Sequence, residues 1–376
     1  MRPLEGLLVV ALEQAVAAPF CTLRLAQAGA RVIKIERAEG DLARGYDAVA
    51  GGDSSYFAWL NQGKESLVLD FKTPDDAALL RRILRKADVM VQNFAPGALD
   101  RAGFAYGDLA AENPRLIRCD ISGYGAADAI ASKRAYDLLV QAESGLIACS
   151  GAPQAPGRIG VSLCDIGAGG AAYAGVLEAL LGRAISGKGV ELAVSLFDFA
   201  AEWMTVPYLH AEFGAGPPEP AGLKHPSIAP YGAFACKDGK LVLISIQNER
   251  EWQRLCGDAL NQPDLASRPE FASNIERVRH REALDAAIGA ICATLSAAEF
   301  CARLEAAKIA YGALNHAGDL ARHPAFRSRN LRNSNGVELP LPAPPVVWPE
   351  APDAAALAQV PKIGAHSAAI RREFSA

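Results

Sequence analysis

The sequence predicts an α/β protein whose larger domain is built on a mainly parallel sheet. In its first half, short apolar runs of strand length alternate with helix-like segments, which is typical of parallel strands joined by covering helices. The chain has 376 residues, of which 51% are hydrophobic and 21% are charged, so it can bury a sizeable core in more than one domain. The formal net charge of −4 argues against duplex nucleic acid as the main partner.

The opening unit reads as strand, helix and strand. The apolar run at 7–12 has strand length, and 19–28 follows with helical spacing, where Pro19 suits the first helical position. After Gly29, which is a plausible helix stop, residues 30–36 predict a second strand. Further strands are predicted at 66–70, 88–91, 116–121 and 190–195, with helices at 74–86 and 165–182.

Two stretches are rich in Gly and Pro, at 214–222 and 339–361. The segment between them has a different pattern of predicted elements from the first half of the chain. Residues 231–246 predict a hairpin that turns at Lys237-Asp238-Gly239. Helical segments are predicted near 249–260, 277–294 and 297–307, and again from about residue 364. The expected division is a large domain whose first part is 1–213, a smaller α+β domain at 223–335, and a linker with a C-terminal return to the large domain at 336–376.

The sequence favours neither a membrane-spanning nor a secreted protein. The apolar stretch at 166–177 is short and rich in Gly and Ala, and the run at 7–12 is flanked by Glu5 and Glu13 rather than by basic residues. The eight cysteines form no Cys-x-x-Cys pair and do not stand at zinc-site spacing with a histidine. We therefore expect a cytoplasmic protein with no metal and no membrane partner.

The first strand–helix turn lacks the glycines of a dinucleotide-binding protein. A Rossmann interpretation would place a ribose-binding acid at Glu36. The turn at 13–19 contains no glycine, whereas G-x-G-x-x-G is what lets the backbone approach a pyrophosphate. Walker A, G-x-S-x-G and H-E-x-x-H are also missing from the sequence. We therefore keep the sheet architecture and discard the dinucleotide site.

Asp165 is the carboxylate that stands out. It lies between an apolar run and a predicted helix crowded with glycines, and so many glycines in a helix suggest that another backbone approaches closely. Asp is a favoured N-cap residue, so a purely structural role fits the pattern. The alternative is a nucleophilic carboxylate. The two roles are compatible, because a helix start also stabilises negative charge.

Four cations of the first half are expected to border one ligand crevice. Each falls near the predicted end of a strand or in the loop after it, and in doubly wound sheets those ends face the ligand. Together they would hold a phosphorylated ligand, although each one alone has the pattern of a solvated surface charge. They are Arg37, Lys72, Arg101 and Arg134.

A series of stretches, in order along nearly the whole chain, resembles the class III CoA-transferases, the group of formyl-CoA transferase, carnitine CoA-transferase and methylacyl-CoA racemase. One such stretch would be weak evidence, but the ordered series is strong. The stretches are 3–6, 17–19, 29–36, 61–64, 69–72, 87–97, 113–114, 122–125, 136–137, 187–189 and 364–366.

The resemblance implies a Rossmann-like large domain assembled from both chain ends, a small domain, and two subunits interlocked as a homodimer. It implies an acyl-CoA and a carboxylic acid as substrates, with coenzyme A carried as its thioester and no tightly bound cofactor. It also implies Asp165 as the catalytic residue. The positions implied to contact CoA are Gln14, Ala15, Val16, Ala17, Arg37, Leu69, Lys72, Asn93, Phe94, Arg101 and Arg134.

Two departures from the family pattern narrow the expected function. The racemases carry a His-Asp pair before the central helix, and the corresponding stretch 132–137 has no histidine, which weighs against proton transfer at an acyl α-carbon. The formyl-CoA transferases carry a run of glycines in the small domain. Here 225–234 and 247–250 stand instead, as in members that handle itaconate, mesaconate or citramalate with succinyl-CoA as the usual donor.

The resemblance thus implies a CoA-transferase that moves CoA from an acyl-CoA donor, expected to be succinyl-CoA, to a small carboxylic acid, expected to be dicarboxylic, through an aspartyl anhydride and thioester at Asp165. Backbone N–H groups at the glycine-rich helix start are expected to stabilise the oxyanion, in a dry pocket that excludes hydrolysis. Two alternatives remain. One is an α-methylacyl-CoA racemase or epimerase of the same fold, and the other is a non-catalytic CoA-binding protein in which Asp165 is only an N-cap.

Overall fold

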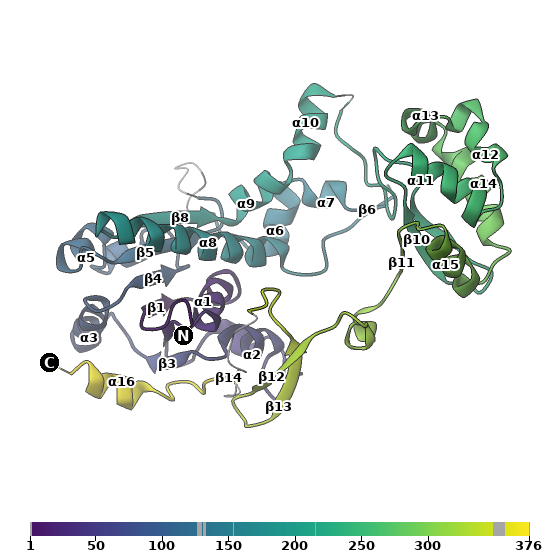
Figure 1. Ribbon diagram of the computed structural model, residues 1–376. Coiled ribbons are helices and arrows are strands. Elements are labelled where there is room, and N and C mark those ends of the chain that lie inside the picture. The colour runs from purple at the N-terminus through teal and green to yellow at the C-terminus, as the bar shows by residue number, and fades with distance from the viewer. Residues whose placement is uncertain are drawn as a thin grey trace. The chain divides into compact units, whose positions relative to one another are not determined.

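The computed structural model describes residues 2–125, 130, 133–152, 154–214, 216–348 and 358–375. The chain packs into two units, which Figure 1 colours along the sequence. The expected division at 1–213, 223–335 and 336–376 stays a prediction, and parts of its two Gly- and Pro-rich breaks, residues 215 and 349–357, lie outside the described residues, as does residue 132. The first unit comprises Met1–Ile147, Arg158–Leu209 and Arg327–Ala376, and the second comprises Ala148–Gly157 and His210–Phe326.

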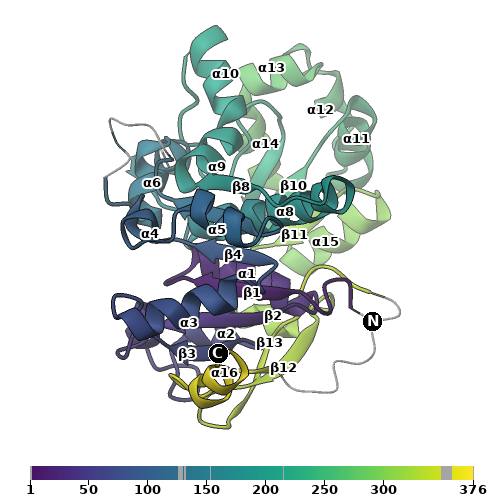
Figure 2. The ribbon, with the colours of Figure 1, turned by 90° about the vertical axis from the view of Figure 1, so that its left-hand side faces the viewer.

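A six-stranded sheet forms the centre of the first unit (Figure 2). Its strand order is β3-β2-β1-β4-β5-β8 and every neighbouring pair is parallel, which confirms the predicted parallel α/β sheet. The order of connection reverses between β1 and β4, and ligands of such sheets bind beyond the carboxyl ends of the strands at this point. The strands are β1 (Leu8–Leu12), β2 (Arg31–Glu36), β3 (Glu65–Val68), β4 (Val89–Gln92), β5 (Ile117–Ser122) and β8 (Glu191–Ser195).

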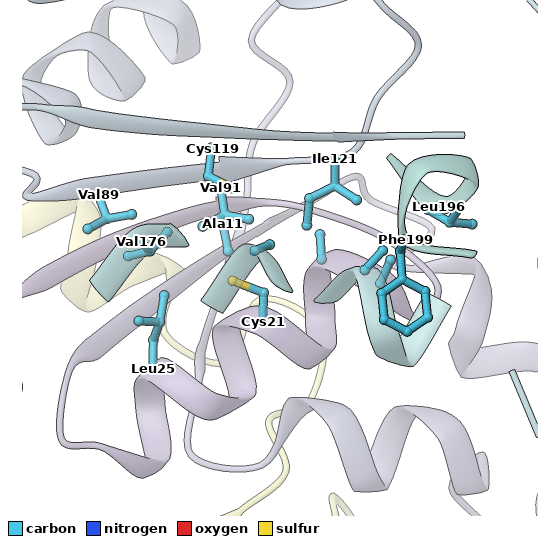
Figure 3. Close-up of a cluster of buried hydrophobic side chains, with 14 of the residues drawn as sticks. Ala11, Cys21, Leu25, Val89, Val91, Cys119, Ile121, Val176, Leu196 and Phe199 are labelled. Carbon is cyan, nitrogen blue, oxygen red and sulfur yellow. The ribbon is translucent and has the colours of Figure 1, made fainter. Parts of the chain in front are cut away.

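Helices cover both faces of this sheet. In β1, Val9 and Ala11 pack in one core and Val10 and Leu12 in the other, which is the period of two that a strand buried on both faces requires. Figure 3 shows the first core, where strand residues such as Val91 meet helix residues such as Cys21 and Phe199. The helices of the first core include α1 (Ala17–Gln27), α6 (Asp137–Glu143), α8 (Leu163–Ser186) and α9 (Leu196–Trp203), and those of the second include α3 (Pro74–Leu84), α5 (Tyr106–Glu112) and α16 (Ser367–Glu373).

Helix α8 approaches its neighbours closely at two glycines. A Cβ atom at Gly169 would overlap the carbonyl oxygen of Ala17, and one at Gly167 would overlap the ring of Phe199. The close approach predicted from the glycine-rich sequence is therefore confirmed. With 24 residues, α8 is also long and apolar enough to cross a membrane by length and composition alone. One face of it lies in the first core.

The termini of some elements differ from the prediction. Helix α1 begins at Ala17 with Val16 as its N-cap, so Pro19 is its third residue and not the first. The Pro-rich stretch from residue 339 is not all linker, because β13 (Glu338–Pro342) pairs with β12 (Ser328–Arg332). Strand β13 lies at the edge of the sheet β13-β12-β14, in which β14 is Ala358–Gln359. Prolines are tolerated at an edge because fewer N–H groups are needed for pairing.

The second unit has its own antiparallel sheet and its own core. Strands β9 (Tyr231–Ala235) and β10 (Leu241–Ser245) form the predicted hairpin, and Gly239 in its turn has a φ of 75°. Strand β11 (Tyr311–Ala313) pairs with the other edge of β10. The helices that contribute to this core include α11 (Glu249–Arg254), α14 (Arg281–Cys292) and α15 (Ala297–Ala306).

Candidate active site

Most of the predicted CoA contacts follow the carboxyl ends of four neighbouring strands. Because these strands are parallel and adjacent, the segments that follow them share one edge of the sheet. Arg101 and Arg134 lie farther along, at the end of α4 (Ala98–Arg101) and in the segment before α6. The strand-end positions are Gln14, Ala15, Val16 and Ala17 after β1, Arg37 after β2, Leu69 and Lys72 after β3, and Asn93 and Phe94 after β4.

These predicted contacts differ in what their side chains can offer a ligand. Leu69 is 1% exposed and belongs to the second core, so only its backbone is available. The ring of Phe94 packs at a centroid distance of 6.1 Å from the ring of Phe71. The four cations Arg37, Lys72, Arg101 and Arg134 are exposed. They are thus free to meet phosphate groups in solution.

The turn between β1 and α1 is held by side chains rather than shaped by glycine. Asn93 Oδ1 accepts a hydrogen bond from the N–H of Gln14 at 2.9 Å, and Asn93 Nδ2 donates to the carbonyl oxygen of Gln14 at 2.8 Å. The N–H of Ala15 donates to Asp41 Oδ1 at 3.0 Å. The φ of Ala15 is 63°, in the left-handed region that residues other than glycine rarely adopt. Asn93 therefore fixes the backbone at the switch point between β1 and β4.

Asp165 lies in the first turn of α8, but it does not cap the helix. The N-cap is Ser162, and Asp165 is the third helical residue, so its interpretation as an N-cap is wrong. Burial, followed by the negative charge of Asp137, raises the pKa of Asp165 from 3.8 to about 7. Removing a carboxylate from water disfavours its charged form, and a second carboxylate nearby adds repulsion. The group is therefore an unusually basic carboxylate.

Asp137 caps α8 from outside the helix. Its Oδ1 accepts hydrogen bonds from the N–H groups of Cys164 at 2.7 Å and Asp165 at 3.2 Å. The N–H of Ile166 donates to the carbonyl oxygen of Ser162 at 2.9 Å. Since these three N–H groups already have acceptors, the expectation that the start of α8 stabilises an oxyanion is wrong for them.

Two tyrosines that were not predicted from the sequence lie near the start of α8. The pKa of Tyr46 is raised by burial and then by the charges of Asp41 and Asp165. Tyr46 is 50% exposed, and its ring stands edge-on to Tyr56 with centroids 5.8 Å apart. The Tyr56 hydroxyl lies 3.2 Å from Ser162 Oγ. These residues come from the segment after β2, and no local motif marks them.

The predicted nucleophile and the predicted β1–α1 contacts meet along one side of α8. Gly169, one turn after Asp165, contacts the carbonyl of Ala17, and Ile166 packs in a small apolar cluster with Ala15 and Val16. Such an arrangement places a basic carboxylate beside backbone at the carboxyl edge of a parallel sheet. It suits attack on a carbonyl carbon of a ligand held at that edge.

The described residues offer no metal site, and one cavity that they form is lined by other residues. No group of three or more His, Cys, Asp and Glu side chains within the described ranges is arranged to hold a metal ion. A cavity of about 380 Å³ in the first unit is lined by residues that include Lys64, Ser334, Lys362 and His366. It contains none of the predicted site residues.

Comparison with known proteins identifies the family. Residues 4–367 match the model of CoA-transferase family III, and the chain belongs to this family of CoA-transferring enzymes. The resemblance found in the sequence is thereby confirmed. The chain is 36% identical over 377 residues to the acetyl-CoA:oxalate CoA-transferase of Acetobacter aceti, covering 100% of this chain and 96% of that protein. It is 30% identical over 385 residues to the succinate–glutarate CoA-transferase of Agrobacterium fabrum, covering 99% and 96%.

Solved structures share the fold over nearly the full chain. A CAIB/BAIF family protein from Brucella suis matches with a TM-score of 0.84 and 32% identity, covering 100% of both chains. The orthorhombic form of Rv3272 from Mycobacterium tuberculosis matches with a TM-score of 0.87 and 26% identity, covering 98% of this chain and 99% of that one.

Proposed function

We propose that the protein moves CoA from an acyl-CoA donor to a small dicarboxylic acid through a covalent intermediate on Asp165. The proposal rests on one observation. Asp165, whose pKa is raised to about 7, lies on the side of α8 that meets the β1–α1 turn through Ile166 and Gly169. A carboxylate that binds protons more tightly is also a better nucleophile once it is ionised.

Each step of the proposed reaction conserves atoms and charge. An oxygen of the Asp165 carboxylate attacks the thioester carbonyl carbon of the donor, the carbon–sulfur bond breaks, and CoA leaves as a thiolate. The thiolate attacks the Asp165 carboxyl carbon of the resulting mixed anhydride, the bond to the donor acyl oxygen breaks, and the donor acid leaves as a carboxylate. An acceptor carboxylate then attacks the aspartyl thioester, and the same steps in reverse give the new acyl-CoA.

The described residues support this chemistry through position and burial. The N–H groups of Cys164, Asp165 and Ile166 are already bonded within the protein, so they hold the start of α8 in place. A fixed nucleophile beside a bound thioester gains rate from proximity, and poor hydration leaves the carboxylate reactive.

The substrate class is proposed from the relatives. The family members described above are named for oxalate, succinate and glutarate, and further relatives at 29% and 30% identity are named for mesaconate and citramalate. All of these acids are dicarboxylates. We therefore propose a dicarboxylate acceptor with succinyl-CoA as the donor. Acetyl-CoA is the second donor to be assayed.

We further propose that the protein works as an interlocked homodimer in the cytoplasm. Large apolar side chains of the first unit stay exposed in the single chain, with Leu181 at 69%, Ile185 at 91% and Trp203 at 58%. A second copy would cover such side chains, which soluble monomers rarely expose together. All eight cysteines are unpaired, which suits a reducing compartment.

Trapping of the covalent intermediate tests the proposal. The protein is incubated with succinyl-CoA, quenched with hydroxylamine, digested and analysed by mass spectrometry. An aspartyl hydroxamate at Asp165 is expected, because hydroxylamine attacks the aspartyl thioester. Asp165→Asn should abolish both the hydroxamate and transfer. The matched control Asp198→Asn, which changes a carboxylate in the first turn of α9, should keep both.

The acceptor is found by combining each donor with oxalate, glutarate, mesaconate, citramalate and itaconate and measuring the new CoA thioester. Transfer that continues in Asp165→Asn, or a hydroxamate at another residue, would contradict the role of Asp165. Exchange of the α-hydrogen of a methylacyl-CoA for deuterium, without any acceptor acid, would instead support a racemase or epimerase.

A further inference from the structure

A sealed group of four charged side chains lies directly behind the β1–α1 turn. We call it the buried ion cluster, and its members Glu13, Lys34, Asp41 and Lys64 have side chains that are 0% exposed. Lys34 Nζ lies 2.7 Å from Asp41 Oδ2 and 3.3 Å from Glu13 Oε1, and Lys64 Nζ lies 2.7 Å from Glu13 Oε1. Two cations balance two carboxylates, so the cluster presents no net charge to a ligand.

The buried ion cluster bonds to the backbone on both sides of the turn. Asp41 Oδ1 accepts from the N–H of Ala15 at 3.0 Å and from the N–H of Ala43 at 2.9 Å. On the other side, Lys64 Nζ donates to the carbonyl oxygen of Pro19, in the first turn of α1, at 3.1 Å. The turn is therefore held by charged groups that cannot move independently, because each one is the partner of another.

Ala15 is the residue whose conformation needs this support. At a φ of 63° its Cβ crowds the backbone, so an alanine is less stable there than a glycine. Dinucleotide-binding proteins use glycines in the corresponding turn. In this chain a hydrogen bond to the buried carboxylate of Asp41 holds an alanine in the same region of backbone conformation.

We propose that Asp41 is a positioning residue for coenzyme A, which acts by fixing the Ala15 N–H and with it the turn at 14–17. Lys34 keeps Asp41 ionised and oriented, and Glu13 and Lys64 keep Lys34 in place. The inference rests on the proposed function, in which this turn contacts CoA. Asp41 does not contact the ligand, since its side chain is fully buried.

Asp41→Asn tests this role with almost no change in volume. The amide oxygen will face the ammonium group of Lys34, which has no acceptor to offer, so the amide NH₂ group must face the N–H groups of Ala15 and Ala43. A donor then meets two donors, so the N–H of Ala15 loses its acceptor, while Asn93 still holds Gln14. We expect the Kd of CoA, measured by calorimetry, to rise about tenfold, which corresponds to about 1.4 kcal/mol. The KM for the acyl-CoA donor should rise in parallel, whereas kcat at saturating donor changes little.

A second substitution separates positioning from a general effect on stability. Ala15→Gly removes the Cβ that crowds the left-handed conformation, so the double variant Asp41→Asn/Ala15→Gly should recover most of the CoA affinity. A purely structural role for Asp41, namely the neutralisation of Lys34, would not be relieved at residue 15. Ala15→Gly alone serves as the reference for the double variant.

Asp88→Asn is the matched control. Asp88 accepts from the N–H of Leu8 at 2.9 Å and from Arg183 Nη2 at 2.9 Å. It therefore pairs a backbone N–H and a cation as Asp41 does, but at the amino end of β1 and not in the turn after it. The Asp88→Asn substitution should lower the Tm of the protein and leave the Kd of CoA unchanged.

Four outcomes would contradict the inference. An Asp41→Asn variant that binds CoA as tightly as the wild type overturns the positioning role alone. A loss of affinity that Ala15→Gly does not relieve, or one that Asp88→Asn reproduces, also overturns it. A wild-type protein that does not bind CoA at all overturns the positioning role together with the proposed function.

Discussion

The Asp137 carboxylate holds the peptide that carries Asp165. Asp137 Oδ1 lies 3.2 Å from the backbone nitrogen of Asp165, and after burial its negative charge is the second cause of the raised pKa of Asp165. One carboxylate thus orients the other and also makes it more basic. The geometric and the electrostatic contributions can be separated by experiment.

The rate of CoA transfer should depend on the ionisation of Asp165. Only the carboxylate is a nucleophile, and its pKa is about 7, so kcat/KM for the acyl-CoA donor should rise with pH and level off above about pH 7. Asp137→Asn removes a negative charge, which lowers the pKa of Asp165 and moves the rise to lower pH. Asp198→Asn is the control and should leave the profile in place. A profile that is flat between about pH 5 and 8 in the wild type would exclude an essential group of this pKa.

Asp165→Asn should stabilise the fold at alkaline pH. The pKa of Asp165 is raised in the folded state from 3.8 to about 7, so the folded state binds its proton more tightly than the unfolded state. The stabilising contribution of that proton is complete below about pH 4 and is lost as the pH rises through about 7. At about pH 8 the neutral asparagine avoids the burial of a charge and should increase the free energy of unfolding by about 1–3 kcal/mol.

Urea unfolding of the wild type and Asp165→Asn at about pH 4 and about pH 8 measures this difference. The two proteins should be nearly equal in stability at the acidic pH and should diverge at the alkaline pH. A variant that is less stable than the wild type at the alkaline pH would contradict the raised pKa of Asp165 in the folded state.

The parallel sheet could be predicted because its signals are local. The apolar runs of β1 and β2 and the helical spacing of α1 and α3 specify their own structure, and parallel pairing follows from strands separated by helices. Strand β13 could not be predicted in this way, because Pro340 and Pro342 disfavour a strand and only its position at a sheet edge makes them acceptable.

The candidate site was predictable only in part, for a similar reason. Asp165 and the strand-end cations follow from motif and placement, but Asp137 and Asp41 act on residues 28 and 26 positions away. No residue near Asp41 in the sequence indicates that Ala15 needs a partner. Such contacts depend on the tertiary structure, and the absence of glycine in the turn is the one signal in the sequence that points to them.

Lys72→Met should weaken the binding of CoA. Lys72 is exposed and follows β3 at the carboxyl edge of the sheet, where it can meet a phosphate group. We expect the KM for the acyl-CoA donor to rise about fivefold to tenfold at low salt, with a smaller effect at high salt because exposed charges are screened. Lys188→Met is the control, since Lys188 is also exposed but precedes β8 at the opposite edge. Equal effects of both variants would assign the loss to overall charge and not to a site.

Gly169→Ala should separate the nucleophile from the β1–α1 turn. The added methyl group would overlap the carbonyl oxygen of Ala17, so α8 must move away from α1. Overpacking of this kind costs about 1–3 kcal/mol of stability, and the displacement of Asp165 should lower kcat/KM by about tenfold or more.

Gly170→Ala is the matched control, because its Cβ would meet only Phe20, at 4.0 Å. It should keep its activity and gain up to about 1 kcal/mol of stability, since alanine is favoured over glycine inside a helix. Equal activity in the two variants would show that the contact between Gly169 and Ala17 does not set the position of Asp165.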